Sequence, residues 1–319
     1  MRIEGDLRVL ENFFRKKHLR SAGDDTHNAY RTWLQGNAGG MAAIHSAAYA
    51  QAFDKQGLVE GTSGMFAISA NMAVLSFMLA GQMDKLAEIF IQKAASKEFI
   101  SWHRFLTGAG PLVDMNFLSP IFREHLNQDA ARRSRLEFWG GLTCATTGRG
   151  ITVDMMRLLP DMVHGIHAGM TIPSRFGPVQ VGHNWCVDGA GVFTFPARYI
   201  IETFGPTDLL IWANRRDVEW WRFLDDAIVS LPMRRSYSAA LCNAFANRHK
   251  QARTELAYLR SQTQCRYLVV WSEQDTGTFE CDRPTLRGIL AEESRQFAAL
   301  LAKAKTAVDA DLRIPVAAE

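Results

Sequence analysis

The sequence predicts an α/β domain with parallel strands. Strand-like and helix-like segments alternate through the first ninety residues, which is typical of such domains. Two later apolar runs, residues 208–213 and 266–271, have the composition of central strands of the same sheet. Apolar types make up 47% of the 319 residues and charged types 22%, so the chain can bury a sizeable core.

The alternation starts at residues 30–35, where aromatic and β-favouring side chains indicate a strand. Residues 36–40 are glycine-rich and must turn the chain, and the alanine-rich residues 41–56 indicate a helix. Residues 58–60 are expected to form a minimal strand. The next segment, residues 61–83, contains no charged residue and is expected to be a long buried helix that starts at Ser63.

The uncharged segment has a second reading as a membrane span, because a bilayer needs about 20 mostly apolar residues. Polar side chains and glycines interrupt residues 61–83 throughout, among them Ser69, Asn71 and Gln82. A helix buried in the protein core is therefore the preferred interpretation.

Beyond residue 90 the pattern is more mixed. Residues 136–147 could hold a strand, and residues 179–187 indicate a hairpin that ends at Asp188. Residues 286–305 have the periodicity of an amphipathic helix.

The domain boundaries follow from this pattern. We expect a helical extension at residues 1–27, one α/β domain at residues 28–305 and a flexible tail at residues 306–319.

Composition and charge narrow the class of protein. The net charge of +3 is too small to create the positive electrostatic field that is typical of nucleic-acid-binding proteins. The five cysteines are an odd number without a C-x-x-C pair, so they are expected to be reduced thiols. The charged start of the chain lacks the apolar stretch of a signal peptide, and we expect a cytoplasmic protein of unknown oligomeric state. The basic residues 15–20 could form the solvent-exposed end of a helix, or could contact the surface of a membrane.

Three small motifs could carry chemistry. Gly61-Thr62-Ser63 could place a nucleophilic serine on a sharp strand-to-helix turn, although serine is also a common helix cap. Gly39-Gly40 could be a tight turn, or could aim backbone N–H groups at a developing oxyanion. Asp188-Gly189 is most often a turn.

Other ligand classes have no matching pattern. Neither G-x-G-x-x-G nor a P-loop occurs, which disfavours nucleotide binding. His164 and His167 could share a helix face, but no further ligand completes a metal site. No cofactor and no metal are therefore expected.

The order of these motifs resembles the patatin-like phospholipase family, in its bacterial single-domain branch. That family has a glycine-rich oxyanion loop, a G-x-S-x-G nucleophile turn and a later D-G-G or D-G-A aspartate. The resemblance covers residues 30–303 and implies a three-layer α/β/α fold with a mixed, mostly parallel central sheet. It also implies a serine lipid acyl hydrolase of phospholipase A or esterase type, with Ser63 as nucleophile and Asp188 as base. Gly39 and Gly40 would form the oxyanion hole, and the substrate would be a lipid or another acyl ester.

Two further functions stay open. Met65 stands where the family has the second glycine of the turn, and Ala42 and Ala43 depart from its oxyanion loop. These departures motivate a non-catalytic protein that only binds lipid or acyl groups. The same scaffold could also serve an acyltransferase or thioesterase, because an acyl-enzyme can be discharged to other acceptors than water. If Met65 opens the turn, Met65→Gly should raise ester hydrolysis.

Overall fold

The computed structural model describes residues 1–134, 136–157, 161–173, 177–216, 230, 233–274 and 276–313. Within these residues one sheet of nine strands has the order β1-β9-β8-β2-β3-β4-β7-β6, and β5 pairs with β4 off this path. The strands are β1 (Arg2–Gly5), β2 (Thr32–Gly36), β3 (Gly64–Ile68), β4 (Glu137–Cys144), β5 (Gly150–Asp154), β6 (Val179–Val181), β7 (Asn184–Asp188), β8 (Asp208–Trp212) and β9 (Arg266–Trp271).

The α-helices are α1 (Arg8–Ser21), α2 (Ala43–Lys55), α3 (Ala70–Leu79), α4 (Met83–Glu88), α5 (Trp102–Leu106), α6 (Met115–His125), α7 (Gln128–Arg133), α8 (Met162–Met170), α9 (Ala197–Phe204), α11 (Ala239–Ala246), α12 (Arg248–Ser261) and α13 (Arg283–Arg313). Short 3-10 turns are η1 (Asp25–Ala29), η2 (Gly40–Ala42), η3 (Leu58–Gly61) and η5 (Gly189–Gly191), and η4 (Ile89–Ala94) is a π-helical turn.

The sheet is mixed, with its parallel part at the centre. The adjacent strands β9, β8, β2, β3 and β4 all run in the same direction. Antiparallel strands lie at the two sides, where β1 pairs with β9 and where β5 and β7 pair with β4. The prediction of an α/β protein with a mixed, mostly parallel sheet is confirmed.

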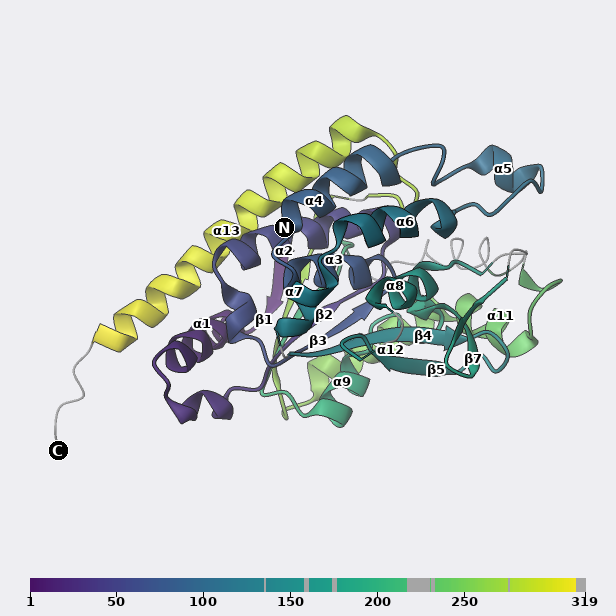
Figure 1. The fold of residues 1–319 in the computed structure, drawn as a ribbon. Helices are drawn as coiled ribbons and strands as arrows, with labels where there is room; N and C mark the ends of the chain where they lie inside the picture. Colours follow the sequence, from purple (N-terminus) through teal and green to yellow (C-terminus); the bar gives the residue numbers. More distant parts are fainter. Residues whose placement is uncertain are drawn as a thin grey trace.

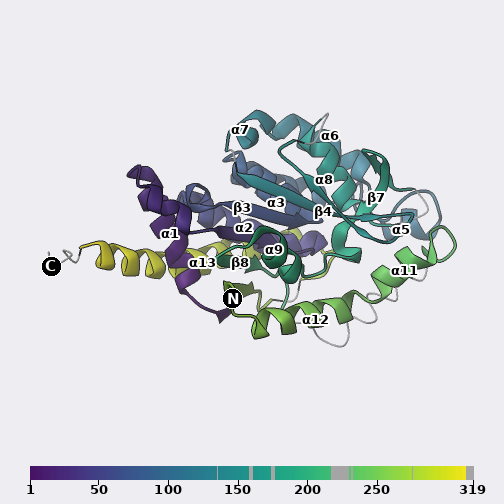
Figure 2. The ribbon, with the colours of Figure 1, turned by 90° about the horizontal axis from the view of Figure 1, so that it is seen from below.

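Helices cover both faces of this sheet (Figures 1 and 2). Alternate residues of the central strands point to opposite faces, so Met65 and Ala67 belong to one hydrophobic cluster and Phe66 and Ile68 to the other. The first cluster is completed by α2, α3 and α13, and the second by α9 and α12. A strand buried on both faces is apolar along its whole length, as β3 is.

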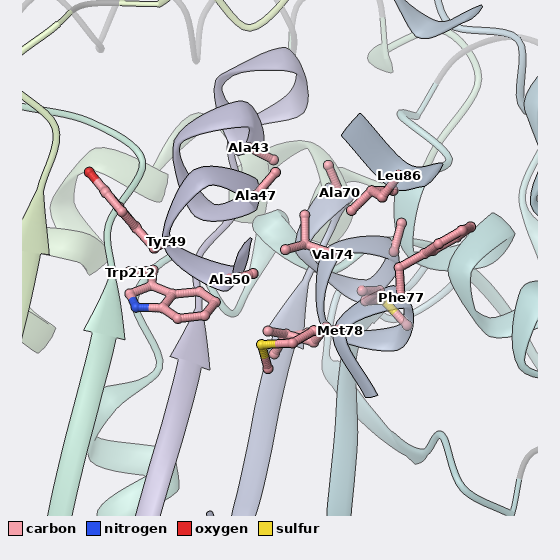
Figure 3. Packing of buried hydrophobic residues seen from close by; sticks show 14 of the residues in the cluster. Ala43, Ala47, Tyr49, Ala50, Ala70, Val74, Phe77, Met78, Leu86 and Trp212 are labelled. Carbon is pink, nitrogen blue, oxygen red and sulfur yellow. The ribbon is translucent and has the colours of Figure 1, made fainter. Parts of the chain in front are cut away.

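Small side chains let α2 and α3 approach each other closely. Ala43, Ala47 and Ala50 of α2 lie toward Ala70 and Val74 of α3 (Figure 3). All five side chains are at most 2% exposed. Because α2 follows β2 and α3 follows β3, this contact fixes the two strand-to-helix turns next to each other.

Two sequence-based expectations about the first ninety residues are wrong. Residues 58–61 form a 3-10 turn instead of a strand, and residues 61–83 are not one helix. They contain β3, a turn at Ser69 and then α3. The absence of charge over residues 61–83 does not distinguish a buried strand from a buried helix, and this explains the error. Among the described residues, no helix is both long and apolar enough to cross a membrane.

The predicted ends of the chain are also refined. The expected helical extension contains α1, but it starts with β1, which forms the edge of the sheet. At the other end, α13 continues to Arg313 through the first part of the expected tail, and residues 314–319 lie outside the described residues. The strand expected within residues 136–147 is β4, which ends at Cys144.

Candidate active site

Ser69 occupies a strained turn between a central strand and a helix. Its backbone angles are φ 56° and ψ −134°, values that residues other than glycine rarely adopt. The turn joins β3 to α3 and leaves the serine 6% exposed. A serine on a strained strand-to-helix turn at the end of a central strand is the geometry of a nucleophile elbow.

The Ser69 hydroxyl donates a hydrogen bond of 2.6 Å to Asp188 Oδ2. The second carboxylate oxygen, Oδ1, accepts from the backbone N–H of Ala190 at 2.8 Å. Both oxygens therefore have a partner, and the carboxylate is held in one orientation toward the serine. This is the contact that a serine–aspartate pair needs for proton transfer.

The sheet register explains why these two residues meet. Ile68 of β3 pairs with Gly141 of β4, and Asp188 of β7 pairs with the next residue, Leu142. Since β5 occupies the other edge of β4 at these positions, β3 and β7 lie end to end along the same edge. Ser69, the first residue after β3, therefore lies against the last residue of β7.

Close packing also fixes the turn after Asp188. A Cβ atom at Gly189 would lie 2.0 Å from the carbonyl oxygen of Gly141, so no side chain fits there. The Thr143 hydroxyl donates to the Asp188 carbonyl oxygen at 2.9 Å. The aspartate is thus anchored to β4 through its backbone, which leaves its side chain to the serine.

Burial shifts the acidity of this carboxyl group. Asp188 is 5% exposed, and loss of hydration raises its pKa from the ordinary 3.8 to about 6. The hydrogen bonds from Ser69 and Ala190 and the charge of Arg248 act in the opposite direction and lower this pKa. A base with a pKa near 6 is ionised at neutral pH and matches proton transfer better than an ordinary aspartate does.

The structure does not bring Ser63, expected as the nucleophile, to Asp188, expected as its base. Ser63 precedes β3 and Ser69 follows it, so they lie at opposite ends of the strand. The Ser63 hydroxyl accepts from the backbone N–H of Thr32 at 3.1 Å and from the Lys16 ammonium group. Ser63 is thus part of the contacts that join β2 to β3 at the end remote from Asp188.

The error has a local cause. At the turn that carries Ser69, Ala67 and Asn71 stand where glycines were expected on both sides of the serine. Met65 is accordingly not a residue of the turn but lies in the middle of β3, fully buried. The signal that could have found the turn is Ser69 itself, a polar residue directly after a short apolar run and before the small Ala70.

Gly39 and Gly40 follow β2 and begin the 3-10 turn η2, which leads directly into α2. Within the described residues, neither backbone N–H group donates a hydrogen bond. Gly40 lines the same cavity as Ser69. It has φ 56°, and a Cβ atom there would lie 2.5 Å from the Thr278 carbonyl oxygen. The N–H of the next residue, Met41, is occupied by that carbonyl oxygen at 2.9 Å.

Two asparagines hold this glycine loop from neighbouring strand ends. The carbonyl oxygen of Asn37 accepts from the amide of Asn71 and, at 2.8 Å, from the amide of Asn214. Asn71 lies two residues after Ser69, so the serine turn and the glycine loop are joined directly. The residue that replaces the expected glycine is therefore a structural link between the two halves of the site.

An apolar cavity lies over Ser69. It encloses about 430 Å³ of space between atoms, its open mouth included. Gly40 and Ala70 line it next to the serine, and Thr278 adds a second hydroxyl. The rest of the lining is hydrophobic, chiefly Phe90, Phe99, Ile100, Leu118, Met170 and Phe279.

Comparison with known proteins adds no further evidence: no family model matches this sequence, and a search of curated proteins finds no match.

Proposed function

We propose that the protein is a serine acyl hydrolase of the patatin-like type, with Ser69 as nucleophile and Asp188 as base. The observation that carries the proposal is the 2.6 Å hydrogen bond between the two side chains, made from a strained turn that faces an apolar cavity. A serine in this backbone conformation is costly to the fold, and such strain is concentrated at functional sites.

The arrangement fits acyl transfer step by step. Ser69 Oγ attacks the ester carbonyl carbon while Asp188 Oδ2 accepts the hydroxyl proton. The N–H groups of Gly39 and Gly40, together with that of Ala70, are the donors proposed for the oxyanion. The proton then passes to the departing alcohol, and water attacks the acyl-enzyme to release the acid.

The cavity supports a hydrophobic acyl chain as the part of the substrate that is bound. An apolar lining stabilises an alkyl chain by removing it from water, and a charged group would lose its hydration there. A lipid or another acyl ester is therefore the proposed substrate.

The fold also supports the proposal. The order of glycine loop, serine turn and Asp-Gly-Ala segment that resembles the patatin-like family is kept when Ser69 replaces Ser63. Helices on both faces of the sheet agree with the proposed three-layer arrangement of that family. The cytoplasm is the proposed location, since all five cysteines lie within the described residues as free thiols.

Hydrolysis of p-nitrophenyl esters of increasing chain length tests the proposal. Ser69→Ala should abolish activity, whereas Ser63→Ala, the matched control at the opposite end of β3, should retain it. If Ser63→Ala abolishes activity and Ser69→Ala retains it, the assignment fails.

The two other functions would give different results. A wild-type protein without activity on any chain length would favour the non-catalytic reading. Faster release of nitrophenol when an alcohol or thiol is added, with transfer of the acyl group to it, would indicate an acyltransferase. Preferred hydrolysis of an acyl thioester to the acid and the thiol would indicate a thioesterase.

A further inference from the structure

A lobe formed by residues 101–111, which contains α5, projects from the body of the molecule (Figure 1). An isolated antiparallel bridge between Ile100 and Val113 closes its base. The backbone N–H of Ser101 also donates to the carbonyl oxygen of Leu112 at 2.9 Å. The lobe therefore leaves the protein and returns to it at one point.

One side chain holds the lobe in shape. The Arg104 guanidinium donates to the backbone carbonyl oxygens of Glu98, Phe99 and Pro111, at 3.0, 3.0 and 2.9 Å. A Cβ atom at Gly110 would lie 2.6 Å from Arg104 Cδ, so the returning chain packs directly on this side chain. The tip is thus presented in a defined conformation.

The tip of the lobe is hydrophobic and exposed. Leu106 is 77% exposed and Trp102 is 47% exposed, although both lie on the five-residue helix α5. A single exposed apolar side chain is ordinary, but two on one projecting turn form a patch. Residues 99–113 include no aspartate or glutamate, and they carry Arg104 and an exposed His103.

The base of the lobe forms part of the cavity over Ser69. Phe99, Ile100 and Val113 line that cavity from the base. The Trp102 ring packs edge-on against Phe279, another lining residue, with 5.5 Å between ring centroids. The exposed patch and the proposed acyl site are therefore continuous.

We propose that the lobe of residues 101–111 binds the surface of an anionic lipid bilayer and places the mouth of the cavity at that surface. This inference rests on the proposed function, because the substrate it delivers is a lipid ester. Tryptophan and leucine favour the boundary between headgroups and acyl chains, and a segment without carboxylates suits an anionic surface.

The basic segment that the sequence offered for this role is already engaged within the protein. Lys16 and Lys17 donate to the carbonyl oxygens of Tyr30 and Gln56, and Arg15 pairs with Asp311. These contacts turn the side chains toward the protein, so they are less free to reach a membrane, which favours the apolar lobe as the lipid-binding surface.

Co-sedimentation with vesicles of phosphatidylcholine and phosphatidylserine tests the proposal. The protein carries Ser69→Ala, so that lipid is not consumed and binding is measured apart from catalysis. Trp102→Ala with Leu106→Ala should weaken binding by about tenfold or more, since two apolar side chains no longer insert. Leu312→Ala is the matched control, because Leu312 is 48% exposed at the far end of α13 and should not change binding.

A second measurement distinguishes a loss of the binding surface from misfolding of the variant. Leu106→Ala alone should leave the thermal unfolding curve unchanged, because the side chain makes little contact with the protein, and should still weaken vesicle binding. Equal binding by wild-type and lobe variants would overturn the proposal. So would a concentration-dependent dimer that disappears in Leu106→Ala, because the patch would then bind a second copy.

The outcomes separate this proposal from the proposed function. Lobe-dependent vesicle binding by a wild-type protein without ester hydrolysis would refute the hydrolase and retain the lipid surface. Hydrolysis of soluble esters without lobe-dependent binding would do the reverse.

Discussion

Replacing Asp188 by asparagine should abolish ester hydrolysis and stabilise the fold at neutral pH. Asparagine has nearly the same shape, so its oxygen can still accept from the Ala190 N–H and its amide can donate to Ser69 Oγ. The change removes the base and also removes a carboxylate that is 5% exposed. Loss of activity through unfolding would require the opposite change in stability.

The magnitude follows from the pKa of Asp188. A pKa raised from 3.8 to about 6 means that the folded protein holds this proton more tightly than the unfolded chain does. The stabilisation from this group is present below pH 3.8 and is lost as the pH rises to about 6. The wild-type free energy of unfolding falls there by about 1.4 kcal/mol per pH unit from this group, or about 3 kcal/mol in all. Asp188→Asn has no such loss.

Urea unfolding of both proteins between pH 4 and pH 8, followed by tryptophan fluorescence, measures this difference. The stability of Asp188→Asn relative to wild type should rise by about 3 kcal/mol up to pH 6 and then stay constant. Ser69→Ala is the matched control. It also removes hydrolysis, but it retains the carboxyl group and loses a hydrogen bond that lowers the Asp188 pKa, so its stability should fall with pH at least as far as that of wild type. A stability difference between Asp188→Asn and wild type that does not vary with pH would refute the reasoning.

Three further changes test separate parts of the structure. In Gly40→Ala, a Cβ atom would lie 2.5 Å from the Thr278 carbonyl oxygen, so the glycine loop must shift. We expect kcat for a p-nitrophenyl ester to fall about 10²–10³-fold, as for the loss of one oxyanion donor. A variant with the kcat of wild type would exclude the loop from catalysis. Met65→Gly should cost about 3–5 kcal/mol in urea unfolding by leaving a cavity in β3, and a gain in hydrolysis would restore the sequence-based view of this residue. Cys144 of β4 lies opposite Cys186 of β7, and the two residues exchange no backbone hydrogen bonds. In antiparallel sheets, pairs of this kind lie closer together than hydrogen-bonded pairs. Hydrogen peroxide should join them in a disulfide, with both thiol hydrogens lost to water, and peptide mapping that finds other cysteines linked instead would contradict this.

The sequence was most informative where structure depends on local chemistry. Gly39-Gly40 and Asp188-Gly189 were located correctly at a strand end because glycine marks turns that no side chain can enter. The hairpin that leads to Asp188 and the strands β8 and β9 were found from their composition, because runs of apolar and β-favouring residues are also a local signal.

The proposed nucleophile, Ser69, could not be found in this way. The turn at Ser69 has alanine and asparagine where a glycine pattern was sought, and its shape is imposed by the contact of α2 with α3 and by the bond from Asn71 to the glycine loop. These are tertiary contacts between separate segments, and the local pattern of residues around Ser69 does not reveal them. The edge strand β1 was missed similarly, because only its pairing with β9, some 260 residues away, makes it a strand.

The most direct test of the account is to treat the wild-type protein with a fluorophosphonate, which reacts with an activated serine, and to map the labelled peptide by mass spectrometry. The account expects one adduct, on Ser69, that is absent from Ser69→Ala and reduced in Asp188→Asn. An adduct on Ser63, or a wild-type protein in which Ser69 stays unlabelled while its hydrolysis is inhibited, would contradict it.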